Sequence, residues 1–258
     1  MRSVLCDLAV ETEAATATWV RLARAFDALH GADTTIVGGD RDSESAFARL
    51  AVAVGKYWVC KRAPGVAYEA MECFGGNGYV EEGPMPRLFR QSPLNAIWEG
   101  SGNVICLDVL RALQREPASF DVFLGEIAAA QGQEPRLQAL VNEFHSDLRG
   151  CANDSELLQR HARRLVDKMA VMLQASVLLQ YGHPDVAAAF CASRLPSTVG
   201  VAGGGGGGAG MASSLPSSSS LPSSSSSLGW NYGAMACDVG GAQIEQTLID
   251  RLLVCQSS

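Results

Sequence analysis

Apolar residues recur at intervals of three and four over most of the chain, which is the spacing of one face of an α-helix. This spacing predicts long helices over residues 3–29 and 42–73 and a third main helix over residues 99–115. Further helices are expected over residues 118–130, 135–149, 154–181, 185–194 and 241–255. No segment shows the strict alternation of a half-buried strand. The sequence therefore predicts an all-α protein, folded as an up-and-down helical bundle.

The first two helices carry the clearest detail. The predicted apolar stripe of the first consists of Leu8, Thr12, Ala15, Trp19, Leu22, Phe26 and Leu29. Arg21 and Arg24 lie off this stripe, so we expect them to face solvent. In the second helix, Pro64 cannot donate a backbone hydrogen bond, so we expect a kink or a break at residues 64–65.

The composition changes abruptly at Pro196. Residues 203–208 are six consecutive glycines, and residues 213–227 are mostly serine. Such a tract buries too little apolar surface to offset its ordering entropy, so we expect residues 196–228 to be disordered. The predicted organisation is a helical bundle over 1–116, extra helices over 117–195, a low-complexity linker over 196–240 and a short C-terminal helix within 241–258.

Charge and cysteine content exclude several classes of protein. The net charge is −7 and the pI is about 5.1, which gives the phosphate backbone of nucleic acid little to attract. The longest apolar runs are shorter than the roughly 18 residues of a membrane span, and early acidic residues argue against a signal peptide.

The eight cysteines include no CxxC pair and no zinc-like spacing, so we expect reduced thiols and no metal site. We expect an intracellular protein, in the cytoplasm or a mitochondrion.

Two short motifs carry the candidate chemistry. Residues 74–79 (FGGNGY) contain three glycines, whose bare N–H groups could hold a phosphate or pyrophosphate or could simply form a turn between helices. Residues 98–103 (WEGSGN) place one carboxylate among small residues. Beside the apolar Trp98, Glu99 could lose solvent and act as a base. Alternatively, it could be a first-turn acid that the helix dipole stabilises.

Other polar side chains could extend this second motif. Asn103 lies four residues after Glu99, and Arg111 lies two turns further on, so a ligand-facing row along one helix is possible. Arg87 and Arg90 could hold an anion or could lie in solvent.

Together, the two motifs resemble the C-terminal helical domain of FAD-dependent acyl-CoA dehydrogenases. In that family the glycine-rich segment contacts FAD, often that of a neighbouring subunit, and an aromatic-Glu-Gly-Thr/Ser motif supplies the base that removes the α-proton of an acyl thioester. The resemblance therefore implies that Glu99 is the catalytic base and FAD the cofactor. It implies FAD contacts from Phe74, Gly75, Gly76, Asn77, Gly78, Ser101 and Asn103, and a substrate cavity with Trp98, Gly100 and Arg111.

Residues 85–90 and 98–111 are similar to the AidB-type, alkylation-response branch of this family, and the helices up to residue 195 resemble its extra C-terminal helices. A trace of the resemblance returns at residues 231–233 and 243–253. The family also has an N-terminal helical domain and a middle β-domain, which have no counterpart in this sequence. We therefore expect a fragment or an incomplete gene product, inactive by itself because its ligand cavity would be open on one side.

Three functions are expected from these observations. The first is the C-terminal portion of an acyl-CoA dehydrogenase-like oxidoreductase that binds an acyl-CoA thioester and forms a homo-oligomer, a dimer or a tetramer. The second is an AidB-like, DNA-associated protective flavoprotein, for which Arg160, Arg163, Arg164 and Lys168 supply one basic helical face. Residues 117–195 nevertheless carry seven Lys and Arg against nine Asp and Glu, which supports DNA binding weakly. The third is a non-catalytic helical module for oligomerisation.

Overall fold

The computed structural model describes residues 1–31, 40–196 and 241–254. Every regular element within these residues is helical, which confirms the predicted all-α class. The predicted disorder of residues 196–228, and the linker as a whole, lie almost entirely outside the described residues.

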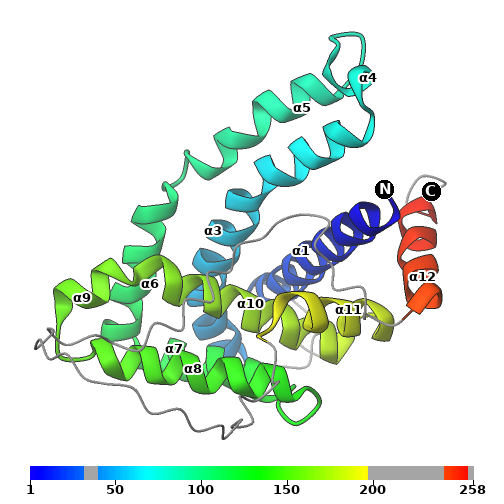
Figure 1. Cartoon of the computed structure of the whole chain (residues 1–258). Helices are drawn as coiled ribbons and strands as arrows, with labels where there is room; N and C mark the ends of the chain where they lie inside the picture. The colour runs from blue at the N-terminus through cyan, green and yellow to red at the C-terminus, as the bar shows by residue number, and fades with distance from the viewer. Residues whose placement is uncertain (32–39, 197–240, 255–258) are drawn as a thin grey trace, which may run out of the picture.

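The chain starts with two long helices that pack against each other, α1 (Arg2–His30) and α3 (Arg41–Cys73). The second half of α3 projects away from the rest of the molecule (Figure 1). The single turn α4 (Gly76–Tyr79) caps it, and α5 (Met85–Gln91) and the 3-10 helix η1 (Ser92–Ala96) return alongside it. We call residues 64–98 the arm.

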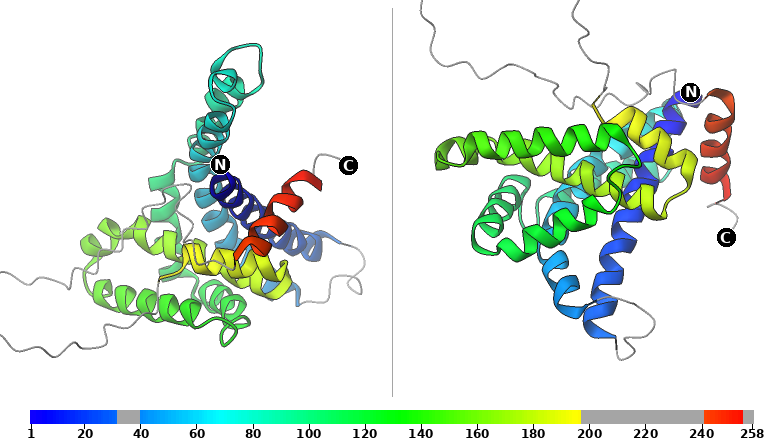
Figure 2. Two further views of the ribbon diagram at one scale, coloured as in Figure 1. Left: turned by 45° about the vertical axis from the view of Figure 1, so that its right-hand side comes forward. Right: turned by 90° about the horizontal axis from the view of Figure 1, so that it is seen from below.

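The remaining helices assemble around the first half of α3. They are α6 (Gly102–Arg115), α7 (Pro117–Ala128), α8 (Pro135–Cys151), α9 (Ser155–Arg160), α10 (Ala162–Tyr181) and α11 (Pro184–Arg194). Helix α10 is the central helix, because it packs on α1, α3, α6, α7, α8 and α11 and most of its residues are buried. With α1 and the first half of α3, these helices form what we call the bundle. A last helix, α12 (Gly241–Val254), lies against α1 and α11 near the N-terminus (Figure 2).

One continuous apolar core runs through the bundle. Its largest fully buried side chains include Phe47, Phe123, Phe144 and Phe190, which come from four different helices. Helix α12 contributes the buried Leu248. No helix in the described residues has both the length and the apolar character needed to span a bilayer.

The face that α1 buries differs from the predicted stripe. Trp19 and Phe26 are 67% and 44% exposed, whereas Arg21 is buried. The Arg21 guanidinium donates hydrogen bonds to the carboxylates of Glu44 on α3 and Glu126 on α7. Small side chains on the buried face of α1 let α3 and α10 approach closely, so the larger side chains of the predicted stripe lie outside.

Two predicted helix boundaries are also corrected. Helix α3 continues through Pro64, so the predicted break is absent. Helix α3 packs on α1, α5 and η1, and this packing offsets the backbone hydrogen bond that Pro64 cannot make. The predicted helix over 154–181 is divided at His161 into α9 and α10.

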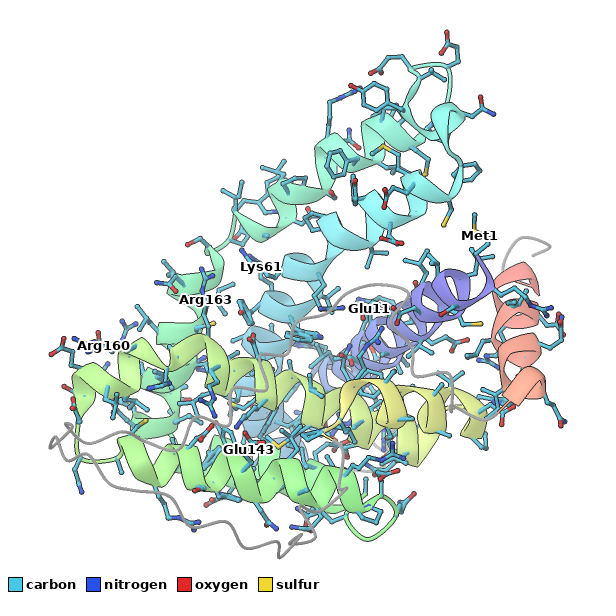
Figure 3. All side chains as sticks on the ribbon, viewed as in Figure 1. Met1, Glu11, Lys61, Glu143, Arg160 and Arg163 are labelled. Atoms are coloured by element: carbon cyan, nitrogen blue, oxygen red, sulfur yellow. The ribbon has the colours of Figure 1, made fainter. Side chains whose placement is uncertain are left out.

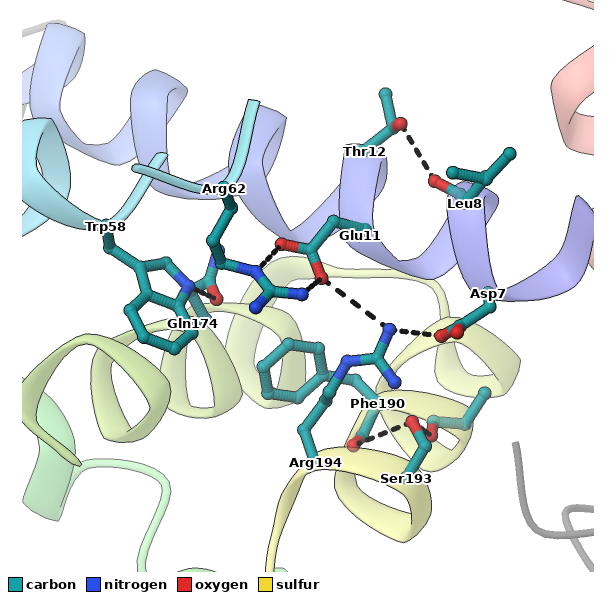
Figure 4. Close-up of polar contacts among 11 residues, drawn as sticks. Asp7, Leu8, Glu11, Thr12, Trp58, Arg62, Gln174, Phe190, Ser193 and Arg194 are labelled. Carbon is teal, nitrogen blue, oxygen red and sulfur yellow. Dashed lines mark hydrogen bonds and ion pairs between the residues drawn. The ribbon is translucent and has the colours of Figure 1, made fainter. Parts of the chain in front are cut away.

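A buried network of charges joins α1 to α3 and α11 (Figure 4). The Arg62 guanidinium donates two hydrogen bonds to Glu11, one of them 2.8 Å long. Arg194 donates to Asp7, and its Nη2 lies 3.5 Å from Glu11 Oε2. Loss of one partner would leave a buried charge without compensation, so this network fixes α1 against its neighbours.

Candidate functional site

Glu99 lies in the turn that joins η1 to α6. Helix α6 begins at Gly102 with Ser101 as its N-cap, so the interpretation of Glu99 as a first-turn acid is wrong. Glu99 has a φ of +55°, and it is the sole non-glycine residue with positive φ in the described residues. Such backbone costs on the order of 1–3 kcal/mol and persists where its surroundings impose it, which often happens at functional sites.

Side chains from α3 and α6 hold this turn. The Lys56 ammonium donates hydrogen bonds to the carbonyl oxygens of Trp98, at 2.8 Å, and Gly100, at 2.6 Å. Gly100 has a φ of +106°, and a Cβ there would lie 3.1 Å from Ile105 Cγ1. Gly100 is therefore required by the turn itself, apart from any contact with a ligand.

Glu99 opens onto a cleft of about 440 Å³ between α3 and α6. Arg49, Asp108 and Arg111 line the same cleft, and both arginines form ion pairs with Asp108, at 3.6 and 3.4 Å. Glu99 is exposed, so the dry recess expected around it is not formed by the described residues. A carboxylate placed in this way can still accept a proton from a ligand that fills the cleft.

The other predicted residues of this motif face different directions. Gly100 and Arg111 line the cleft with Glu99, but Asn103 Oδ1 accepts a hydrogen bond from Arg163 Nε on α10 at 2.9 Å. The proposed ligand-facing row along α6 therefore contains Arg111 without Asn103. Ser101 is exposed, and its side chain forms no capping hydrogen bond.

Trp98 points into a second and larger groove of about 840 Å³, between α1 and the α5–η1 segment. Most of its wall is apolar: Ala15, Val59, Ala63, Val66, Ala67, Ala70, Leu88, Leu94 and Trp98. Glu11 and Arg62 from the buried charge network also line it. The sequence did not reveal this groove, because its wall combines α1, α3 and the α5–η1 segment, which are distant from one another in sequence.

The glycine motif forms the tip of the arm. Gly75 has a φ of +57° and precedes α4. A Cβ on Gly78 would lie 2.1 Å from the carbonyl oxygen of Met71, so the turn requires glycine at this position. A Cβ on Gly76 would meet no atom within 4 Å. The fold therefore requires glycine at position 78. At Gly76 there is room for a side chain, so packing does not explain why this residue is glycine.

The exposed tip lies far from Glu99. Phe74 is 62% exposed, and Asn77 is exposed as well. Lys56, which contacts the Glu99 turn, and Cys73, at the end of α3, are separated by about 26 Å of helix at a rise of about 1.5 Å per residue. The two motifs therefore lie at opposite ends of the arm (Figure 1), and one chain does not bring them together.

Carboxylates of the same chain lie against the predicted basic face and pair with most of its cations. Its four members, each with a partner, are Arg160, Arg163, Arg164 and Lys168. Lys168 Nζ lies 2.8 Å from Glu143 and 2.6 Å from Asp147, and Arg164 also contacts both carboxylates. Arg160 pairs with a glutamate of its own helix, and Arg163 lies on the same side of the molecule as the start of α6 (Figure 3). This pairing reduces the attraction of the face for phosphate.

A buried polar cluster supports the start of α6. The Tyr57 hydroxyl donates to Asp167 Oδ1 at 2.8 Å, and a Cβ on Gly102 would lie 3.2 Å from the Tyr57 ring. Burial raises the pKa values of Tyr57 and Asp167, and it raises the pKa of the nearby Cys106 thiol to about 12. All six cysteines in the described residues are free. No group of three His, Cys, Asp or Glu side chains suited to a metal ion occurs there either.

Comparisons with known proteins place these features in context. Residues 1–114 match the family described as acyl-CoA dehydrogenase, C-terminal domain. Over 201 residues the chain is 35% identical to the putative acyl-CoA dehydrogenase AidB of Escherichia coli strain K12, covering 78% of this chain and 34% of that relative. Over 86 residues it is 40% identical to acyl-CoA dehydrogenase family member 11 of Caenorhabditis elegans, covering 33% of this chain and 14% of that relative.

A solved structure shares the fold. The crystal structure of Caenorhabditis elegans ACDH-11 in complex with C11-CoA aligns with a TM-score of 0.57 and 23% identity, over 69% of this chain and 32% of that chain. The present chain thus spans about a third of the length of the Escherichia coli relative and of the ACDH-11 chain.

Proposed function

This chain belongs to the acyl-CoA dehydrogenase family, and we propose that it forms the C-terminal helical portion of an FAD-dependent oxidoreductase acting on acyl-CoA thioesters. The observation that carries this proposal is the strained Glu99 turn. It stands at the aromatic-Glu-Gly-Ser position of the sequence, it is bonded on both sides by Lys56 of α3, and it opens onto a cleft. Among the described residues, the Glu99 carboxylate takes part in no ion pair, so its strained position is free to serve a ligand.

In the proposed reaction Glu99 acts as a general base. A carboxylate oxygen of Glu99 takes the α-proton of the thioester, and the electron pair of the broken C–H bond forms a double bond between the α- and β-carbons. A hydride leaves the β-carbon with its own electron pair. FAD, when bound, would supply the acceptor for that hydride. Gly100 leaves room beside the base, and we assign Gly100 and Arg111 to the substrate cavity at the Glu99 cleft and Trp98 to a continuation of that cavity in the larger groove.

The separation of the motifs supports a homo-oligomer. By their place in the motif we assign Ser101 and Asn103 to the FAD of the same chain, whereas the tip of the arm lies about 26 Å away along α3. The open backbone at Gly76 fits close approach of a phosphate-bearing group. We therefore assign the tip to the FAD of a second copy, through Phe74, Gly75, Gly76, Asn77 and Gly78. In this assignment residues 1–116 carry the chemistry and residues 117–195 support them.

A second candidate function is a non-catalytic oligomerisation module. It is favoured by the apolar residues that the arm exposes: Tyr68, Phe74, Tyr79, Val80, Leu88, Leu94, Ile97 and Trp98. Clusters of exposed apolar side chains are typical of interaction surfaces. The AidB-like, DNA-associated function has less support, because its basic face is paired with carboxylates.

The deciding experiment measures proton removal by itself. The purified chain is incubated with FAD and a saturated acyl-CoA in D₂O, and NMR follows exchange of the α-protons. We expect Glu99→Gln to slow this exchange by about 10²-fold or more, and Glu82→Gln, which removes an exposed carboxylate of the arm, to leave it unchanged. Flavin absorbance of the purified chain, and dye reduction by a hybrid in which this chain replaces the matching third of the Escherichia coli relative, extend the test.

Undiminished exchange or turnover in Glu99→Gln would remove Glu99 from the role of base. A chain that retains no flavin, exchanges no α-protons and still forms a stable oligomer would favour the second candidate.

A further inference from the structure

One ammonium group bonds the backbone on both sides of Glu99. Lys56 Nζ lies 2.8 Å from the carbonyl oxygen of Trp98 and 2.6 Å from that of Gly100. Lys56 belongs to α3, which is separated from this turn by more than forty residues of chain and runs unbroken from Arg41 to Cys73. The turn is thereby fastened to the longest helix in the described residues.

The partners of Lys56 distinguish it from the other cations of the same cleft. Arg49 and Arg111 each pair with the carboxylate of Asp108. Among the described residues, no carboxylate lies within ion-pair distance of Lys56. An ammonium has three donors on a compact head, so it can bond two carbonyl oxygens that converge on one point. Lys56 therefore acts here by donating hydrogen bonds to the backbone, whereas Arg49 and Arg111 pair with the charge of Asp108.

The bonded carbonyls determine where Glu99 points. The Trp98 carbonyl lies in the peptide plane between Trp98 and Glu99, and the Gly100 carbonyl lies in the plane between Gly100 and Ser101, so Lys56 holds the turn on both sides of Glu99. Glu99 has the strained φ of +55°, and without an external hold a glutamate relaxes toward negative φ. That relaxation would swing the side chain away from its present direction along the cleft.

We propose that Lys56 is a positioning residue: it holds the Glu99 turn in its strained form and so aims the carboxylate at the reacting carbon. The second half of this statement rests on the proposed function, and the first half stands independently of it. The sequence offered a signal for this residue, because Lys56 is the single charged residue within the apolar run 51–60.

The test on the full 258-residue chain uses a protease that cleaves after glutamate. In Lys56→Met, which keeps most of the side-chain volume, we expect cleavage between Glu99 and Gly100 to rise about tenfold, because a held turn resists a protease until it opens locally. Cleavage after the exposed Glu82 serves as the internal reference. Lys61→Met removes an exposed ammonium from the same helix and should leave cleavage after Glu99 unchanged.

A second readout separates aiming from simple stability. With acyl-CoA and FAD in D₂O, Lys56→Met should slow α-proton exchange by about tenfold or more at saturating substrate, since small misplacement of a reacting group is costly. The substrate concentration for half-maximal rate should stay within about twofold. Lys56→Arg, which retains donors but not the compact head, should recover part of the rate.

The outcomes are distinct. Unchanged cleavage after Glu99 in Lys56→Met overturns the proposal, and so does increased cleavage with an undiminished exchange rate. If neither the unmodified chain nor its hybrid with the Escherichia coli relative exchanges α-protons, the proposed function fails before any variant is compared, and cleavage then decides by itself whether Lys56 holds the turn.

Discussion

The bundle and the arm differ in how completely their apolar side chains are buried and their charged side chains are paired within the chain. Within the bundle, large aromatic residues such as Phe190 are buried, and the charges of Asp7 and Arg194 pair in the interior. The arm leaves Phe74 and Tyr79 62% and 77% exposed and carries an open glycine turn. The bundle therefore has the features that stabilise a fold, whereas the arm and the Glu99 turn expose groups that are available to other molecules.

The strongest test of this comparison makes one substitution in each region. Phe190→Ala removes a ring that is 1% exposed and should lower the free energy of unfolding by about 3–5 kcal/mol. Phe74→Ala removes the same ring at the tip of the arm and should change it by less than about 0.5 kcal/mol. Urea denaturation followed by circular dichroism measures both. An equal loss for both variants would show that the arm is packed more tightly than its exposure indicates.

A smaller effect is expected within the tip itself. Gly78→Ala places a methyl group against the Met71 carbonyl oxygen and should destabilise the chain by about 1–3 kcal/mol. Gly76→Ala places one in open space, so thermal unfolding should be nearly unaffected. If the tip contacts FAD, Gly76→Ala should still weaken flavin binding by about tenfold, as measured by fluorescence titration. Unchanged flavin affinity would mean that the tip has only a structural role.

The smallest effect concerns the thiols. Burial raises the pKa of Cys191 in the bundle to about 12, against 9.0 without burial. The folded state therefore holds this proton more tightly, so the stability it contributes is complete below pH 9.0 and declines as the pH rises toward 12. Cys191→Ala should make the free energy of unfolding less dependent on pH in this range. Cys73→Ala, next to the tip of the arm, should change this pH dependence less. Equal slopes for all three proteins would contradict the burial of Cys191.

Local pattern predicted the elements but not which face of each would be buried. Helical spacing located α1 and α3 to within about two residues. It placed Trp19 in the core and Arg21 in solvent, and both are wrong, because small residues and a paired arginine pack as well as a large apolar stripe does. The number of apolar positions cannot distinguish these two faces.

The candidate site divides in the same way. Glu99 and the glycine motif were identified from short stretches of sequence and from resemblance, and their roles remain predictions. Lys56 was missed because its partners lie 42 and 44 residues away, a distance that no local spacing reports. The position of Asn103 against Arg163 depends on the packing of α6 on α10, which likewise has no local signature.

The uninterrupted course of α3 through Pro64 has a mechanical consequence. Helix α3 is packed among the buried helices at one end and carries the glycine tip at the other, so a small rotation at the packed end moves the tip by a larger distance. A tilt of about 5° at Lys56 would displace the tip by about 2 Å over 26 Å of helix. The accuracy with which one copy could reach a cofactor in another would then depend on how rigidly the bundle holds the first half of α3.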